Sequence, residues 1–211
     1  MRDVEAATTP ATRSLTALAE SAHACRACPL WRTATQTVFG EGTPHAPIML
    51  VGEQPGDQED RAGHPFVGPA GRLLNEALER AGIDRRQTYV TNAVKHFKWI
   101  ASGDRGKRRI HQKPSSREIH ACRPWLLAEI DAVAPEVIVC LGATAAASLL
   151  GRGFRVTQHR GEPVPSAFPA RVVPTVHPSS ILRARDDDAR ARELTAFVAD
   201  LRAAAALVAS H

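Results

Sequence analysis

The stretch Leu50-Val51-Gly52-Glu53-Gln54-Pro55-Gly56 indicates the fold of this chain more strongly than any other segment. The apolar run over 47–51 is typical of a buried strand, and it ends in a turn rich in glycine and proline that carries one acid and one amide. At the carboxyl end of a parallel strand the chain leaves the sheet, so backbone N–H groups and side chains can converge there on a ligand. We therefore expect a site at this turn, beneath a loop over 65–71 that carries Phe66.

The rest of the chain alternates between predicted strands and helices. The helix with the clearest start has Ser115 or Ser116 as its cap, and Glu118 is placed to complete a capping box. The alternation predicts one α/β domain over 13–208, with a parallel sheet covered on both faces, after a frayed segment over 1–12. The predicted strands are 47–52, 88–94, 136–141 and 171–176, and the predicted helices are 14–25, 115–132, 143–150 and 188–208.

From the composition we expect neither a membrane span nor a signal peptide. The 211 residues contain no long apolar run, and the first residues include Asp3 and Glu5 without an apolar segment behind them. We therefore expect a cytoplasmic protein of bacterial origin, in which the four cysteines are thiols or metal ligands and not disulfides. A net charge of +5 permits a polyanionic partner without requiring one.

Most of the useful positive charge lies in one segment, 95–117. It contains eight Lys and Arg residues against a single acid, Asp104, with Phe97 and Trp99 interleaved. Because glycines and a proline interrupt it, we predict a loop without regular structure. The segment is either a solvated surface loop or an arm that follows the phosphates of a nucleic acid.

Further polar residues follow other predicted strands. Asn92 lies near the end of the second strand, and His177-Pro178-Ser179-Ser180 ends the fourth. An Asn or a His in such a position is more often a turn, cap or core residue when it stands alone. Their joint placement with Glu53, Gln54 and Phe66 at one sheet edge favours a functional site.

Four motifs in this order resemble those of the iron-sulfur uracil-DNA glycosylases: GEQPG at 52–56, PFVGPAG at 65–71, TNAVK at 91–95 and HPSS at 177–180. The resemblance covers about residues 20–205. It implies a four-stranded parallel sheet flanked by helices, an iron-sulfur cluster, and a flipped uracil whose N-glycosidic bond is cleaved at the carboxyl edge of the sheet. The implied partner is uracil-containing DNA, preferably single-stranded, bound by a monomer.

The chemistry of uracil gives a reason for each residue type. Phe66 can stack on the flat ring, and the Asn92 amide can accept from N3–H while it donates to O4, a pattern that cytosine does not match. His177 and backbone N–H groups near Gln54 can stabilise the negative charge that grows on the departing base. The other predicted substrate-binding residues are Gly52, Gly56, Arg109 and Ser179.

The segment after TNAVK departs from the common family pattern. The basic insertion over about 97–114, with Lys107-Arg108-Arg109-Ile110-His111 near its end, resembles the UdgX type of uracil-DNA glycosylase. That resemblance implies that His111 attacks C1′ of the deoxyribose and stays bonded to it, so that the enzyme acts once. Glu53 would accept the imidazole proton or stabilise the cation, with Gln54 and Asp57 as orienting residues.

Two alternatives to crosslinking stay open at this point. If His111 only contacts phosphate, Glu53 would position water and the protein would be an ordinary hydrolytic glycosylase with turnover. The remaining alternative is a non-catalytic, metal-stabilised nucleic-acid-binding module.

A metal centre is predicted from the cysteines. Cys25-Arg26-Ala27-Cys28 is a strong ligand pair, and Cys122 supplies a third ligand. Counting cysteines suggests Cys140 as the fourth, whereas the family resemblance suggests His96, at a position where relatives carry a cysteine. We favour His96, because Cys140 lies within a predicted apolar strand. The expected cofactor is a 4Fe-4S cluster, with zinc as the alternative.

Overall fold

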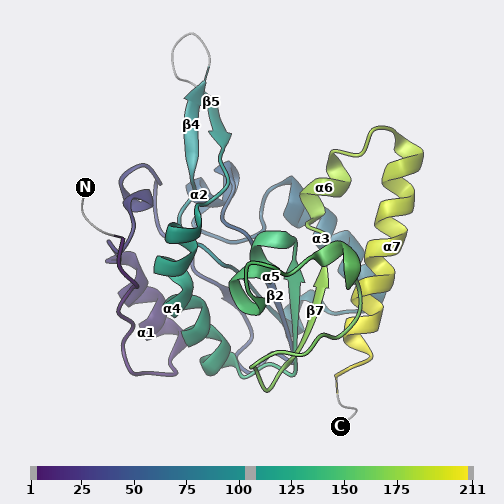
Figure 1. Ribbon diagram of the computed structural model, residues 1–211, viewed down its shortest axis with the longest axis horizontal. Helices are drawn as coiled ribbons and strands as arrows, with labels where there is room; N and C mark the ends of the chain where they lie inside the picture. The colour runs from purple at the N-terminus through teal and green to yellow at the C-terminus, as the bar shows by residue number, and fades with distance from the viewer. Residues whose placement is uncertain (1–3, 103–107, 209–211) are drawn as a thin grey trace.

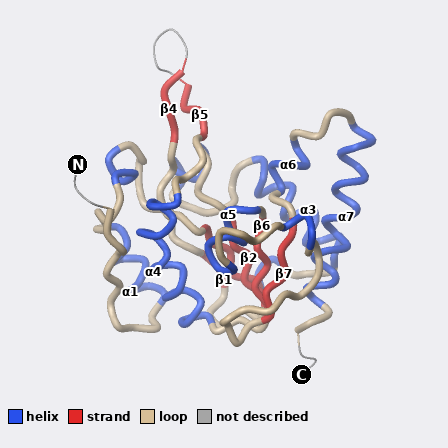
Figure 2. Tube along the Cα trace, viewed as in Figure 1, coloured by secondary structure: helices blue, strands red, loops and turns tan. Residues whose placement is uncertain are grey.

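The computed structural model describes residues 4–102 and 108–208 and has a central sheet with helices on both faces (Figures 1 and 2). The sheet has the order β1-β3-β2-β6-β7. The inner strands form because their runs are apolar and rich in β-branched residues, and β2, β3 and β6 are buried along their whole length. The strands are β1 (Glu41–Gly42), β2 (Ile48–Gly52), β3 (Thr88–Asn92), β6 (Val137–Leu141) and β7 (Arg171–Thr175).

All four predicted strands are confirmed, and they are parallel to one another. The prediction of a purely parallel four-stranded sheet is wrong, because the short β1 pairs antiparallel with β3 and makes the sheet mixed. A strand of two residues has no alternation that a sequence pattern could reveal. The parallel register aligns Gly52 with Asn92, so the ends of β2 and β3 lie side by side.

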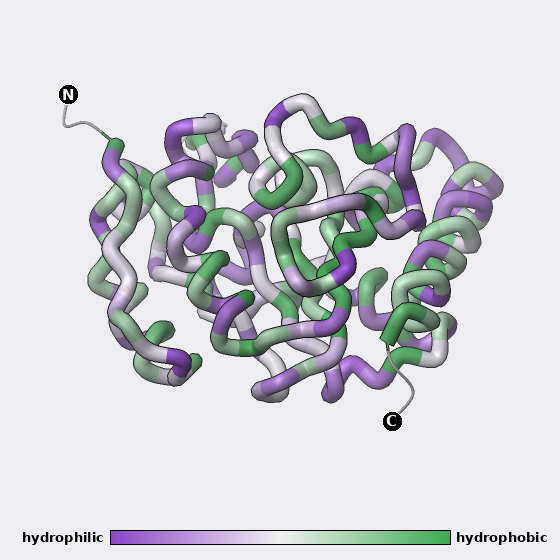
Figure 3. The backbone as a smooth tube through the Cα atoms, turned by 60° about the horizontal axis from the view of Figure 1, so that its bottom comes forward, coloured by the Kyte–Doolittle hydropathy of each residue, from purple (hydrophilic) through white to green (hydrophobic). Residues whose placement is uncertain are grey.

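The helices divide between the two faces of the sheet. Along β2, Ile48 and Leu50 face the core beneath α3, α6 and α7, whereas Met49 and Val51 face the core beneath α4 and α5. Figure 3 shows apolar and polar residues alternating along α7, which covers one edge of the molecule. The helices are α1 (Leu15–His23), α2 (Asp57–Ala62), α3 (Pro69–Ala81), α4 (Ser116–Val133), α5 (Ala143–Leu150), α6 (Pro178–Leu182) and α7 (Asp187–Ala205), with short 3-10 turns η1 (Pro29–Arg32), η2 (Arg85–Gln87) and η3 (Val156–Gln158).

The start of α4 confirms the predicted capping box. Ser115 Oγ accepts from the Glu118 N–H at 3.3 Å, and Glu118 Oε2 accepts from the Ser115 N–H at 2.6 Å. None of the helices in the described ranges is long and apolar enough to cross a membrane. Residues 4–12, which we expected to be frayed, contain no helix or strand, but Ala7 is buried and its N–H donates to the Ala121 carbonyl at 2.9 Å.

The basic insertion is not the irregular loop that we predicted. It forms a two-stranded antiparallel hairpin of β4 (Trp99–Ser102) and β5 (Arg108–His111), and Figure 1 shows it projecting from the body of the protein. The cross-strand pair of Ile100 and Ile110 is of the kind that stabilises such a ribbon. The part of the predicted loop at 103–107 lies outside the described residues.

Candidate active site

The end of β2 has room for two neighbouring side chains only because residue 52 is glycine. A Cβ atom on Gly52 would lie 2.4 Å from Asn92 Oδ1 and 2.7 Å from Phe66 Cζ. Atoms do not approach so closely without displacement. The structure therefore brings Phe66 and Asn92 together over Gly52, as predicted from three separate motifs.

Asn92 combines burial with an unused amide. The residue is 3% exposed, and its side-chain amide has no hydrogen-bond partner in the described part of the chain. The main-chain carbonyl of Asn92 accepts from Lys95 Nζ at 2.7 Å, and Lys95 forms a buried ion pair with Glu129. Within the described residues, the fully buried side-chain polar atoms without a partner are Trp125 Nε1 and Arg160 Nη2. The Asn92 amide atoms are therefore not sealed in the core and stay accessible to a ligand.

Phe66 is held in an unusual backbone conformation. Its φ is 58°, in the left-handed region that a bulky residue rarely adopts. The following helix presses against it, because a Cβ atom on Gly71 would overlap the Phe66 carbonyl. The ring centroid lies 6.3 Å from that of His177, with 29° between the ring planes.

His177 has one defined protonation state. Its Nδ1 accepts from the Ser179 N–H at 3.1 Å and lies 2.8 Å from Ser179 Oγ, so the ring proton is on Nε2. Burial, with the charges of Arg183 and His111, lowers the pKa of His177 to about 4. The ring is therefore neutral near pH 7, with Nε2–H as a donor.

Glu53 connects the sheet edge to the hairpin. Its Oε2 accepts from Thr144 Oγ1, and its Oε1 lies 3.5 Å from His111 Nε2. The His111 side chain is 50% exposed, and its ring lies 6.1 Å from that of Phe97. Sequence reasoning missed Thr144, although Gly142-Ala143-Thr144 follows β6 at the same edge and could have indicated it.

Gln54 lies at the base of the hairpin, and its side chain bonds there to the main chain and not to Phe66 or Asn92. Its Nε2 donates to the carbonyls of Lys98 and Gln112, at 3.3 and 3.0 Å, and its Oε1 accepts from the Lys98 N–H at 3.2 Å. The side-chain amide is thus occupied by backbone on both sides of the hairpin. Through these bonds it positions the strand that carries His111.

Arg109 and Asp57 form a second connection between the hairpin and α2. The Arg109 guanidinium donates to the Asp57 carboxylate and to Asp60 Oδ2, the latter at 2.6 Å, and it lies 5.4 Å from the ring centroids of Phe97 and Trp99. Burial opposes ionisation of Asp57, but hydrogen bonds from Arg61 and Arg109 outweigh it and lower the pKa of this carboxyl. Asp60, which sequence reasoning missed, is fully buried.

The loops around the site are joined by a further acid. The Glu59 carboxylate accepts from the Gly56 N–H at 3.1 Å and from the Gly68 N–H at 2.7 Å. Gly56 is the N-cap of α2, and Gly68 is the N-cap of α3. Glu59 therefore fixes the GEQPG turn to the loop that carries Phe66.

The predicted metal ligands gather around one small cavity. Cys25, Cys28, His96 and Cys122 line it, together with Trp125. Cys140 lies instead in β6, in the apolar core against α4 and α5. Over the described ranges, no group of three or more His, Cys, Asp or Glu side chains is arranged to hold a single metal ion.

His96 is oriented within this cavity by Thr37. The His96 Nε2 lies 3.0 Å from Thr37 Oγ1, and that hydroxyl also donates to the Ala22 carbonyl at 3.2 Å. Burial lowers the pKa of His96 to about 4, so the imidazole is neutral. A neutral imidazole is the form that binds metals.

Comparison with known proteins identifies the family of the chain. The uracil DNA glycosylase superfamily matches residues 39–202. The chain belongs to this superfamily. It is 40% identical to the Type-4 uracil-DNA glycosylase of Thermotoga maritima over 174 residues, which cover 82% of this chain and 85% of the relative. It is 37% identical to the Type-4 enzyme of Sulfurisphaera tokodaii over 177 residues, covering 80% and 76%.

In this member of the uracil DNA glycosylase superfamily, the predicted site residues separate into two groups. Gly52, Phe66, Asn92, His177 and Ser179 lie around the ends of the sheet strands. Gln54, Asp57 and Arg109 instead connect the hairpin to the body. Glu53 and His111 meet where the two groups adjoin.

Proposed function

We propose that this protein excises uracil from DNA and then becomes covalently joined, through His111, to C1′ of the abasic sugar. The observation that carries the first half is the unpartnered amide of Asn92, a largely buried residue, beside the Phe66 ring. The names of the relatives, which are Type-4 uracil-DNA glycosylases at 40% and 37% identity, support the same reaction.

Recognition of the base follows from these two side chains. Phe66 stacks on the flat ring, and Asn92 accepts from N3–H and donates to O4. Cytosine presents an acceptor at N3 and a donor at C4, which would leave both buried amide atoms facing like groups. An Asn held in one orientation therefore discriminates uracil from cytosine.

Cleavage of the C1′–N1 bond leaves its electron pair on uracil and a cation on the sugar. The neutral His177 ring donates its Nε2–H to O2 of the departing base and stabilises the growing anion. Ser179 holds the tautomer that makes this donation available.

The crosslinking step uses the position of His111. A ring nitrogen of His111 forms a bond to C1′ of the sugar cation, and the imidazole N–H proton passes to Glu53. The separation of 3.5 Å between His111 Nε2 and Glu53 Oε1 supports this transfer. Since the histidine is part of the protein, it reaches the cation at a high effective concentration compared with water.

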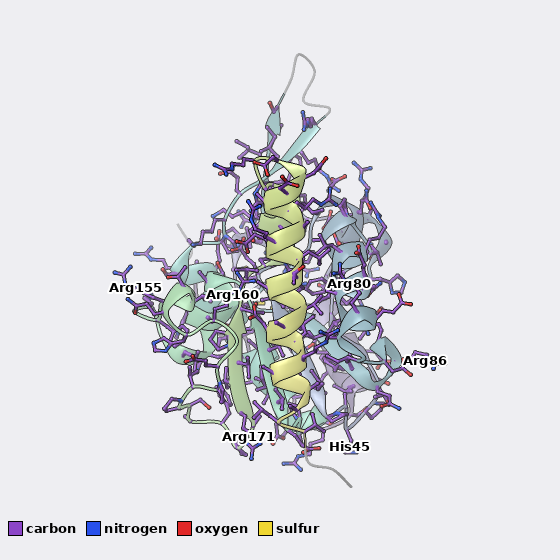
Figure 4. The ribbon with its side chains drawn as sticks, turned by 90° about the vertical axis from the view of Figure 1, so that its right-hand side faces the viewer. His45, Arg80, Arg86, Arg155, Arg160 and Arg171 are labelled. Atoms are coloured by element: carbon purple, nitrogen blue, oxygen red, sulfur yellow. The ribbon has the colours of Figure 1, made fainter. Side chains whose placement is uncertain are left out.

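One incubation separates the alternatives. Single-stranded DNA with one uracil is mixed with the protein and run on a denaturing gel, with and without alkali. We expect a shifted protein-DNA band that is absent in His111→Ala and present in His45→Ala, a control at an exposed histidine far from the site (Figure 4). Free abasic DNA without the band would show hydrolytic turnover, and unchanged DNA would leave only a binding module.

We also propose that Cys25, Cys28, Cys122 and His96 hold an iron-sulfur cluster that joins α1, α4 and the loop after β3. Three thiolates and an imidazole around one cavity suit such a group. Trp125 also lines this cavity, and its Nε1–H is a buried donor without a partner among the residues described.

Colour and metal content test the cluster. We expect a brown protein whose iron content falls in His96→Ala and stays unchanged in Cys140→Ala. A colourless protein with one bound zinc would contradict the cluster. Equal iron loss in both variants would contradict the ligand set.

A further inference from the structure

We propose that a groove between α4 and α5 binds the phosphates of the single DNA strand next to the uracil, an inference that rests on the proposed function. The groove has a volume of about 640 Å³, which is in the range of ligand sites. Side chains from the first turns of α4 and from α5 with its following residues form its walls. Those that matter here are Lys113, Ser116, His120, Arg123, Thr144 and Arg152.

The charge of the groove has one sign. Three Lys or Arg side chains line it and no Asp or Glu does. Lys113 and Arg152 are exposed and have no ion-pair or hydrogen-bond partner within 4–102 and 108–208. Arg123 donates from Nε to the Ser148 carbonyl at 3.0 Å, which anchors its side chain in the groove. Unpaired cations along a concave surface are typical of a path for a phosphate backbone.

The groove is continuous with the candidate active site. Thr144 lines the groove and also donates to Glu53, the acid beside His111. Lys113 follows His111 by two residues, where the hairpin leads into α4. Figure 1 shows the first turn of α4 directly below the base of the hairpin. When the flipped uracil lies over Gly52, the DNA strand on one side of the reacting sugar can therefore continue into this groove.

The groove also has an apolar side. Ile119 and Leu150, both partly buried, line it together with the cations. Sugars and base faces can pack on such side chains while the phosphates contact Lys and Arg. This combination favours a single strand over a small isolated anion.

The test compares two double variants with equal loss of charge. Lys113→Gln with Arg152→Gln removes two groove cations. Arg86→Gln with Arg171→Gln removes two cations at the amino ends of β3 and β7. Figure 4 shows Arg171 at the end of the molecule opposite the hairpin and Arg86 on the side of the molecule, away from the hairpin. Each protein is given a long single-stranded oligonucleotide and a trinucleotide, both with one uracil, and the second-order rate constant of single-turnover uracil excision, with enzyme in excess, is measured at several salt concentrations.

We expect the rate constant of the groove variant on the long strand to be about 25-fold lower at about 0.1 M salt, and to recover near about 1 M. The slope of the log of this rate constant against log salt becomes shallower by about 1.4, because each lost phosphate contact on a single strand contributes about 0.7. On the trinucleotide, which has only one nucleotide on each side of the uracil and so does not extend along the groove, the groove variant and the control variant remain alike.

Two results would contradict the proposal that the groove binds DNA. One is a groove variant that matches the control on the long strand. The other is an equal loss on the trinucleotide, which would place the effect at the reacting centre. If the parent protein excises uracil from neither substrate, the proposed function fails. The groove is then tested by the binding of uracil-free single strands to the groove variant and to the control variant. A slope of log affinity against log salt that is shallower by about 1.4 in the groove variant supports the groove, and equal slopes refute it.

Discussion

The sheet edge and the hairpin base are both rich in polar side chains, but they use them differently. At the sheet edge, the Asn92 amide and Nε2 of His177 have no hydrogen-bond partner within the described part of the chain. At the hairpin base, the Gln54 amide is occupied by three backbone bonds and Arg109 by two carboxylates. Free groups can act on a ligand, whereas occupied groups hold structure.

This difference separates two steps of the proposed reaction. The sheet edge lies on strands buried within the core, so it is fixed by the main fold. The hairpin that carries His111 is fixed by polar contacts to Gln54 and α2. Changes at the sheet edge should therefore affect excision, and changes at the hairpin base should affect crosslinking alone.

The largest expected effect is at Asn92. Asn92→Ala removes both hydrogen bonds to the base, and we expect excision to fall about 10³-fold. Crosslinking falls with it, because no sugar cation forms without excision. Single-turnover release of uracil measures the loss. Asn75→Ala, at an exposed amide in α3, should behave as the parent does. Normal excision by Asn92→Ala would refute its assignment to the base.

A change at Arg109 tests the proposed role of the hairpin base. Arg109→Gln breaks the contacts with Asp57 and Asp60, and displacement of His111 should slow crosslinking about 100-fold while uracil release continues. The readout is the rate of the gel-shifted band relative to the rate of uracil release.

Arg108→Gln is the matched control, since Arg108 is exposed on the same strand. If Arg109 contacted the DNA, as its predicted role in substrate binding implies, Arg109→Gln would slow release and crosslinking together and flatten the salt dependence. Equal loss of the two rates would therefore contradict its role in positioning His111.

The pocket residues could be predicted from sequence because each follows a strand with a strong apolar pattern. Once four parallel strands are assigned, Glu53, Asn92 and His177 must meet at one edge. The motif order indicated the uracil DNA glycosylase superfamily, which the comparisons confirm. Phe66 could be predicted from its position alone, in the loop that follows Glu53.

The hairpin contacts could not be predicted in the same way. Arg109 and Asp60 are 49 positions apart, and neither lies in a periodic pattern that relates them. The glycines of the insertion led us to predict an irregular loop. The hairpin was missed because strands of four residues give a weak alternating signal. Contacts between side chains on separate elements depend on tertiary packing, which sequence periodicity does not encode.

The acid stability of the protein should depend on His177. Since burial lowers its pKa from 6.5 to about 4, the unfolded chain binds the proton more readily than the folded protein between these values. Stability is therefore complete above about pH 6.5 and decreases as pH falls toward 4. At about pH 5 we expect a loss of about 2 kcal/mol in the free energy of unfolding.

Urea unfolding of the parent and of His177→Asn at about pH 7 and about pH 5 measures this loss. The variant should lack this part of the pH dependence, since Asn does not titrate. An identical change with pH in both proteins would show that His177 is protonated in the folded state at its ordinary pKa.

The smallest expected effect is at Ser179. Ser179→Ala removes the hydroxyl beside His177 Nδ1 but keeps the Ser179 N–H that fixes the tautomer. We expect excision to slow about fivefold, equivalent to about 1 kcal/mol. Ser180→Ala is the control, because that hydroxyl donates to the His177 carbonyl and not to the ring. The ratio of crosslinking to excision should stay constant, since the ring belongs to the sheet edge. A changed ratio would mean that the sheet edge and the hairpin are not independent.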